Sequence, residues 1–236
     1  MQNTEHKPEQ QIQKVATDPQ EEKIERLVDF FLLNKTLIIG VTVGIIMIAG
    51  WLFFYQQQRL SSEKSAFNLL SHAETQTAEG NWQKAIEGEG SMKGLREIIR
   101  EYGSTESGNR AKILLGDSFL ALNQVDSALA YYSEYKGSNP DLAASAKAGA
   151  AFCRLWKKEY PEAVTAFEDA SETAQNHALK SSYLADAADV YRSIDSLDTA
   201  VRLYKQIIRK YPDYAAAAKA RQSLLALAGK TENTEL

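Results

Sequence analysis

Two 34-residue stretches decide the fold: NRAKILLGDSFLALNQVDSALAYYSEYKGSNPDL (Asn109–Leu142) and SSYLADAADVYRSIDSLDTAVRLYKQIIRKYPDY (Ser181–Tyr214). They carry related residues at positions 7, 8, 11, 20, 24 and 32, namely Leu115, Gly116, Phe119, Ala128, Tyr132 and Pro140, then Ala187, Ala188, Tyr191, Ala200, Tyr204 and Pro212. Small residues at positions 8 and 20 let two helices touch, bulky ones at 11 and 24 fill the space between repeats, and proline at 32 ends the second helix. Because one helix hairpin cannot bury its apolar face alone, the pattern predicts a stack of hairpins.

Weaker copies of this pattern flank the two clear ones. Between them, Gly149, Phe152 and Leu155 match positions 8, 11 and 14, and Trp156–Glu159 predicts a turn lengthened by two residues before Ala163 and Phe167. Upstream, Phe67–Glu79 predicts a first helix and Gly80-Asn81 a turn, but EGEGSMKG (87–94) breaks the phase and predicts a flexible loop. Ala215–Ala228 predicts a final capping helix.

The repeated unit resembles the tetratricopeptide repeat. That resemblance implies an all-α fold in which about four hairpins and a capping helix form a right-handed solenoid superhelix. It also implies that positions 2, 5, 9 and 12 of each first helix line a protein-binding groove. These positions hold Arg110, Ile113, Asp117 and Leu120, then Ala143, Ala146, Ala150 and Cys153, then Ser182, Ala185, Asp189 and Arg192.

The small side chains of the middle repeat have two interpretations. They leave room for an inserted peptide or helix, or they only tighten the superhelix. One ligand class is excluded, because domains of this type that clamp a C-terminal carboxylate use Lys and Asn at positions 5 and 9. Here those positions hold Ile113 and Asp117, and an acidic side chain repels a carboxylate.

A single uncharged run, TLIIGVTVGIIMIAGWLFFY (Thr36–Tyr55), precedes the repeats. As a helix it spans ~30 Å, the thickness of a bilayer core, and it is too long and too far from the start for a cleaved signal peptide. Gly40 and Gly44 form a GxxxG pattern that predicts either close contact with a partner helix or ordinary membrane-helix composition.

The sequence predicts five parts in the chain: a disordered head (1–17), an amphipathic juxtamembrane helix (18–35), a transmembrane helix (36–55), a repeat domain (56–229) and a polar tail (230–236). Asp18 and Pro19 predict the start of the juxtamembrane helix. Its apolar stripe indicates either an interfacial helix or one continuous with the span. Three basic residues flank the span before it and two after it, which favours a cytoplasmic head and a periplasmic repeat domain.

Composition and residue spacing argue against several other functions. From Arg59 onwards there are 22 basic and 24 acidic residues, so no basic surface for nucleic acid is expected. His6, His72 and His177 lie far apart, and no spacing suggests a metal. Cys153 is the only cysteine and predicts a packed, unreactive thiol. We therefore expect no enzyme activity and no cofactor.

The arrangement as a whole resembles the YfgM-like family of bacterial inner-membrane proteins, mostly through TESGNRAKILLGDSFLALNQVDSALAYYSEY (Thr105–Tyr135). The resemblance implies a periplasmic scaffold that accompanies the Sec translocon and periplasmic chaperones and holds newly exported chains. It is compatible with a homo-oligomer. Two alternatives remain open: an adaptor in another envelope-assembly complex, and a recruiter that faces the cytoplasm through inverted topology.

Overall fold

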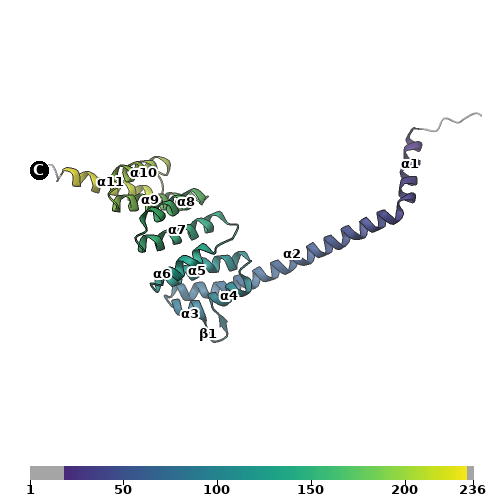
Figure 1. The fold of residues 1–236 in the computed structure, drawn as a ribbon, viewed down its shortest axis with the longest axis horizontal. Helices are drawn as coiled ribbons and strands as arrows, with labels where there is room; N and C mark the ends of the chain where they lie inside the picture. The colour runs from purple at the N-terminus through teal and green to yellow at the C-terminus, as the bar shows by residue number, and fades with distance from the viewer. Residues whose placement is uncertain (1–18, 233–236) are drawn as a thin grey trace, which may run out of the picture. The chain divides into compact units, whose positions relative to one another are not determined.

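The computed structural model describes residues 19–232 (Figure 1). The predicted head at 1–17 and the capping residue Asp18 lie outside this range. The helices are α1 (Pro19–Leu33), α2 (Lys35–Ala78), α3 (Trp82–Glu87), α4 (Leu95–Tyr102), α5 (Glu106–Ala121), α6 (Val125–Ser133), α7 (Pro140–Trp156), α8 (Tyr160–Thr173), α9 (His177–Ser193), α10 (Leu197–Lys210) and α11 (Ala215–Glu232). The predicted all-α class is confirmed, and the chain divides into two compact units between Gln57 and Gln58.

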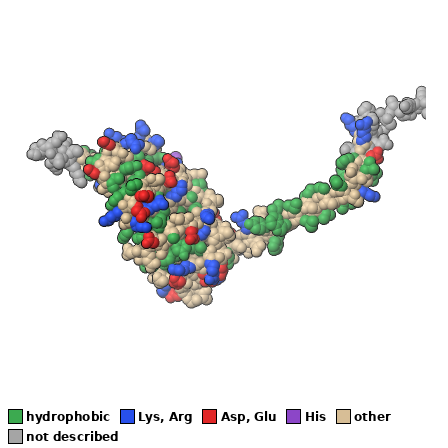
Figure 2. Space-filling view, in the orientation of Figure 1, with side chains coloured by type: hydrophobic (Ala, Val, Ile, Leu, Met, Phe, Trp, Pro, Cys, Tyr) green, Lys and Arg blue, Asp and Glu red, His purple; other side chains and the backbone are tan. Residues whose placement is uncertain are grey.

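Helix α2 contains the candidate membrane span. Its most apolar 18-residue window has a mean hydropathy of 2.5 and is not buried, and the helix is long enough to cross a membrane. Figure 2 shows hydrophobic side chains along it. The helix does not end with the apolar run but continues without a break to Ala78, because residues 56–66 contain neither glycine nor proline. The same helix therefore supplies the first helix of the repeat array.

Helix α1 is separated from α2 at Asn34. The Asn34 side-chain amide donates to the Phe30 carbonyl at 2.9 Å, which satisfies a carbonyl near the end of α1. Ile24, Val28 and Phe31 are exposed along the helix. The structure thus has two helices here, and docking of α1 on lipid stays a prediction.

Four helix hairpins and a final helix follow within the described residues. Each hairpin turns at a residue with positive φ: Gly80 (77°), Asn123 (58°), Lys158 (63°) and Asp195 (60°). The first helices α5, α7 and α9 start at side-chain caps, where Thr105, Asn139 and Asn176 accept backbone N–H bonds. Pro140 opens α7 rather than ending α6, since a proline fits the first turn of a helix.

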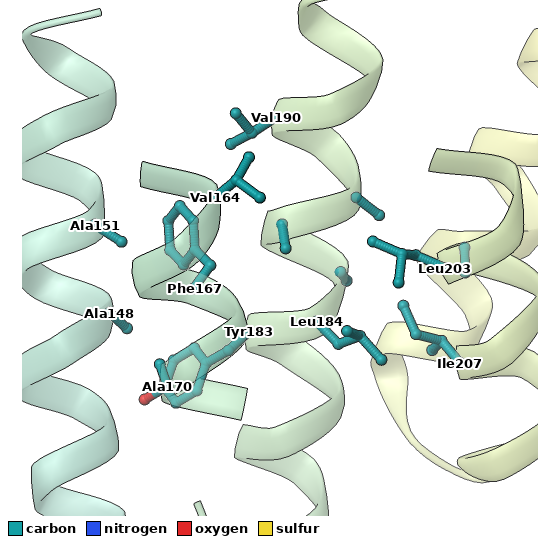
Figure 3. Close-up of a cluster of buried hydrophobic side chains, with 14 of the residues drawn as sticks. Ala148, Ala151, Val164, Phe167, Ala170, Tyr183, Leu184, Val190, Leu203 and Ile207 are labelled. Carbon is teal, nitrogen blue, oxygen red and sulfur yellow. The ribbon is translucent and has the colours of Figure 1, made fainter. Parts of the chain in front are cut away.

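The middle hairpin corrects the predicted alignment. Its turn is no longer than the others, because α7 ends at Trp156 and α8 begins at Tyr160. Aligned on Lys158, position 8 is Ala151 and not Gly149. Figure 3 shows Ala151 pointing toward Phe167 of the same hairpin. Gly149 instead faces the preceding hairpin, where a Cβ added to it would lie 2.5 Å from the ring of Tyr132.

The segment 87–94 also differs from the prediction. Instead of a flexible loop, β1 (Gly88–Glu89) and β2 (Met92–Lys93) form a short antiparallel hairpin that splits the second helix of the first repeat into α3 and α4. Gly88 has φ of 88°, and a Cβ there would lie 2.2 Å from the Met92 carbonyl oxygen. Only glycine allows this close approach.

Alanine-rich packing forms the core of the solenoid. One cluster joins α7 to α11 around Phe167, Leu203 and Tyr204 (Figure 3). A second cluster joins α2 to α7 around Leu70, Leu115 and Tyr132. Small residues at the helix contacts let the helices approach, so large side chains fill the remaining spaces between hairpins.

Two polar contacts tie the first hairpin to the second. The Glu63 carboxylate of α2 accepts from the backbone N–H of Ser107 at 3.2 Å and from its hydroxyl, at the start of α5. The buried Lys112 ammonium donates to the carbonyls of Gly103 (3.3 Å) and Glu134 (3.2 Å), near the ends of α4 and α6. An anion at a helix start and a cation at helix ends both complement the helix dipole.

Candidate protein-binding groove

The first helices of the hairpins lie side by side. Helix α5 contacts α7, α7 contacts α9, and α9 contacts α11. Counting back six residues from each positive-φ turn residue gives one equivalent residue per first helix. We call these four residues the groove row: Glu74, Asp117, Phe152 and Asp189. They are position 9 of each repeat in the alignment set by the turns.

Each row residue of the last three hairpins contacts the second helix of its own hairpin. The Tyr132 hydroxyl donates to the Asp117 carboxylate at 2.6 Å, and Tyr204 donates to Asp189 at 2.5 Å. In the middle hairpin a pair of rings replaces the acid–tyrosine pair. Phe152 and Phe167 meet edge to face with centroids 4.8 Å apart. The same position therefore changes from acidic to aromatic and back along the groove.

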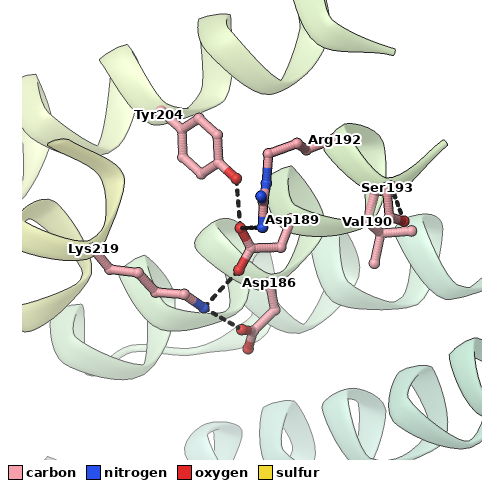
Figure 4. A network of polar contacts seen from close by, with 7 residues as sticks. All are labelled: Asp186, Asp189, Val190, Arg192, Ser193, Tyr204 and Lys219. Atoms are coloured by element: carbon pink, nitrogen blue, oxygen red, sulfur yellow. Dashed lines mark hydrogen bonds and ion pairs between the residues drawn. The ribbon is translucent and has the colours of Figure 1, made fainter. Parts of the chain in front are cut away.

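Cations occupy both ends of the row. At one end Arg110 pairs with Glu74 at 2.7 Å. At the other, Lys219 of α11 pairs with Asp189 at 2.7 Å and with Asp186 at 3.5 Å, and Arg192 lies 3.4 Å from Asp189 (Figure 4). Arg110 comes from the next first helix along the array and Lys219 from the capping helix, whereas Arg192 lies on α9 itself.

The two equivalent aspartates differ in acidity. The helices around Asp117 displace part of its hydration, and this desolvation raises the pKa of its carboxyl. The hydrogen bond from Tyr132 offsets only part of the increase. Because Asp117 remains accessible to solvent, the desolvation is incomplete. Burial would also raise the pKa of Asp189, but hydrogen bonds from Lys219 and Tyr204 outweigh burial and lower it. Asp117 is thus the less compensated carboxylate.

Two hollows lie along the row. One has a volume of about 310 Å³ and is lined by residues of α2, α5 and α7, including Glu74, Asp117 and Ser145. The other has a volume of about 350 Å³ and is mainly apolar, with Phe152, Leu155 and Val190 in its walls. In the first hollow Arg110 pairs with Glu74, which leaves the Asp117 carboxylate there without a cation among the described residues. A hollow with one unpaired carboxylate and a mainly apolar hollow can together hold a segment with one cationic and one apolar side chain.

The structure places the predicted groove residues unevenly. Arg110, Ile113 and Asp117 line the first hollow and Asp189 lines the second, while Arg192 is exposed beside it. Leu120 is half-buried against the core and lines neither of these two hollows.

Ala146 and Cys153 do not lie on the groove surface. Ala146 is buried and borders a different pocket, between α6, α7 and α8, and Cys153 has no exposed surface. Both expectations were wrong for one reason: the middle repeat was aligned two residues out of register, which assigned core positions to the groove.

Sequence reasoning missed Glu74, Phe152, Ser145 and Lys219 as groove residues. The signal that finds the first three is the turn itself. The first helix of each hairpin is followed by a residue with positive φ, namely Gly80, Asn123, Lys158 and Asp195. Counting back from these residues aligns all four hairpins. Lys219 lies in the capping helix, where no repeat pattern applies.

Within the described part of the chain, Gly40 and Gly44 of the span face open space. A Cβ added to Gly40 or to Gly44 would meet nothing within 4 Å. A partner helix at this face therefore stays a prediction.

Among the residues that the structure describes, no group of three or more His, Cys, Asp or Glu side chains could hold a metal ion. Burial, with Asp117 nearby, raises the pKa of the Cys153 thiol to about 11. At neutral pH such a thiol holds almost no thiolate, which is the reactive form.

Comparison with known proteins agrees with this geometry. The tetratricopeptide repeat family matches residues 186–214. A search of curated proteins finds no match. A solved structure from Podosopora anserina, described as a kinesin light chain with nearly identical TPR-like repeats, is 14% identical, with a TM-score of 0.57 over 73% of this chain and 91% of the other. Residues 186–214 therefore match the tetratricopeptide repeat, and the fold of the chain is like that of a solved structure built from TPR-like repeats. Repeats of this kind generally form a non-catalytic scaffold that binds other proteins.

Proposed function

We propose that the protein is a membrane-anchored periplasmic scaffold that assists the Sec translocon and periplasmic chaperones with exported chains. The observation that supports this proposal is a row of two hollows on a helix array whose first helix also contains the candidate membrane span. The groove row offers acidic and aromatic side chains to a partner. The resemblance to the YfgM-like family supplies the translocon and the chaperones as partners.

Orientation in the membrane is the first part to test. The basic residues near the span favour a cytoplasmic N-terminus. Asp213→Cys in the loop after α10 and Lys23→Cys in α1 place single exposed thiols on the two sides of the span. The buried native Cys153 contributes little background. An impermeant maleimide should label Asp213→Cys in intact spheroplasts and Lys23→Cys only after lysis; the reverse pattern contradicts the proposal and favours a cytoplasmic recruiter.

The partners are tested by crosslinking in membranes. A benzophenone amino acid at position 152 should crosslink a periplasmic chaperone or an exported chain, and one at position 44 should crosslink a translocon subunit. The control position is Arg202, exposed on α10 outside the groove. Crosslinks from 152 and 44 only to outer-membrane assembly or division proteins would favour the alternative function, an adaptor in another envelope-assembly complex. Recovery of neither group refutes the proposal.

Gly40 and Gly44 are proposed as the contact between the span and a membrane partner. Both small residues face open space along one side of α2. For this test the benzophenone amino acid is moved to Met47, which is exposed about one turn further along the same face of α2. Replacing both glycines with isoleucine should remove the crosslink from position 47 to a translocon subunit and leave the crosslink at position 152 intact. An unchanged crosslink from position 47 would show that the glycines have no role in this contact.

A further inference from the structure

The Asp117 carboxylate differs from the other acidic residues of the groove row in what surrounds it. Glu74 has Arg110, and Asp189 has Lys219 and Arg192. Among the described residues, Asp117 is bonded to the Tyr132 hydroxyl and is paired with no cation. The middle of the groove thus carries a negative charge that the chain itself does not neutralise.

The chain shows how a cation would sit there. Arg110 lies seven residues before Asp117 on α5 and reaches Glu74 on the preceding first helix. The equivalent residue on α7, seven before Phe152, is Ser145, whose hydroxyl is 3.0 Å from that of Tyr183. A short hydroxyl thus stands where a guanidinium would neutralise Asp117.

An apolar site adjoins the acidic one. Phe152 is 42% exposed although its ring packs edge to face with that of Phe167. Leu155 and Val190 complete the apolar wall of the same hollow. Covering an exposed aromatic ring with an apolar side chain is favourable, so this hollow is suited to a hydrophobic anchor.

We propose that the groove binds a partner segment in which a Lys or Arg side chain pairs with Asp117 and an apolar side chain about three residues away packs on Phe152. The spacing follows because neighbouring helices pack about 8–10 Å apart and an extended chain rises about 3.3 Å per residue. Anionic partners are disfavoured at this place, since among the described residues no cation pairs with the Asp117 carboxylate to offset its repulsion. This inference rests on the proposed function, because it requires that a partner chain enters the groove.

The test uses the full chain in lipid nanodiscs and fluorescein-labelled peptides. The probe is Gly-Ser-Lys-Ser-Gly-Phe-Ser-Gly, together with the reversed order of its Lys and Phe. One control peptide has norleucine in place of Lys, and another has Ala in place of Phe. Fluorescence anisotropy should show about tenfold tighter binding of the Lys peptide than of the norleucine peptide, as a charge-assisted contact provides.

Two variants of the protein locate the contact. Asp117→Asn keeps an acceptor for Tyr132 but removes the charge, and should abolish the preference for Lys. Asp126→Asn makes the same charge change on α6, at an exposed site outside the groove, and should leave the preference intact. Ser145→Arg should also abolish the preference, because its guanidinium occupies Asp117 from within the chain.

The outcomes separate this inference from the proposed function. The inference is overturned if wild type binds the Lys and norleucine peptides equally or binds neither, or if Asp117→Asn and Ser145→Arg both fold, by circular dichroism, and keep the preference. The crosslinks at position 152 in membranes are read independently of the peptides. If those crosslinks persist while the peptide preference is absent, the proposed function stands and the cation site falls.

Discussion

The ring of Tyr132 lies between two glycines, and Gly149→Ala should therefore destabilise the repeat domain. A Cβ on Gly149 would lie 2.5 Å from Cε1 and Cζ of Tyr132, and a Cβ on Gly116 would lie 2.7 Å from Cε1. The ring cannot move aside freely, because Tyr132 is buried and its hydroxyl is held by Asp117 at 2.6 Å.

The expected cost combines three effects. Overpacking a core costs about 1–3 kcal/mol. Displacing the ring would also weaken a hydrogen bond to a carboxylate, which is worth about 1.5–3 kcal/mol. Replacing glycine by alanine within a helix returns about 1 kcal/mol. We expect a net loss of about 2 kcal/mol, which corresponds to a Tm lower by about 4–8 °C for a domain of this size.

Thermal and urea unfolding of the full chain in detergent, followed by circular dichroism, measures this loss. A double-mutant cycle then identifies the partner of Gly149. In a Tyr132→Ala background the clash is gone, so Gly149→Ala should be neutral or stabilising there. In a Phe167→Ala background it should cost as much as in wild type.

A Gly149→Ala variant that is as stable as wild type or more stable would contradict the clash with Tyr132. Coupling of Gly149 to Phe167 and not to Tyr132 would contradict it as well. That second result would restore the sequence-based alignment, in which Gly149 packs within its own hairpin.

Three further predictions concern charged and buried groups. Asp189→Asn should lower the free energy of unfolding by about 1 kcal/mol at pH 7, a small loss because the cations that pair with Asp189 are half exposed. The pKa of Asp189 is lowered in the folded chain, so the difference between the two proteins should disappear as the pH falls through that pKa. Lys112→Met should cost about 1–3 kcal/mol at pH 7, because it removes the charged donor of the hydrogen bonds to the Gly103 and Glu134 carbonyls. Burial lowers the pKa of Lys112 in the folded chain, so the unfolded chain binds more protons than the folded chain as the pH rises toward 10.5. The free energy of unfolding of the wild type should therefore increase with pH relative to that of Lys112→Met. Equal pH slopes in the two proteins would contradict this account. Cys153 should react with a thiol reagent only after denaturation, and fast reaction of the native chain would show that the core opens.

Local pattern was enough to predict the helices and the repeat unit. A helix depends on residues three and four apart, so the spacing of Leu115, Gly116 and Phe119 could be read without knowing any distant contact. The uncharged run from Thr36 to Tyr55 likewise predicted a membrane-spanning helix. What local pattern did not reveal is that this helix continues to Ala78 and becomes part of the first hairpin.

The groove depended on tertiary structure because its residues meet across helices. The register between hairpins decides whether Cys153 faces the groove or the core. It also decides whether Gly149 meets Phe167 or Tyr132. A shift of two residues along a helix rotates a side chain through more than half a turn, so a small error in register reverses both assignments. Local sequence pattern was enough to predict a stack of helix hairpins and a candidate membrane span before it. Only the packed solenoid brings Glu74, Asp117, Phe152 and Asp189 into one row, because packing between helices joins residues that are far apart in sequence. The same packing leaves Asp117 without a cation among the residues that the structure describes.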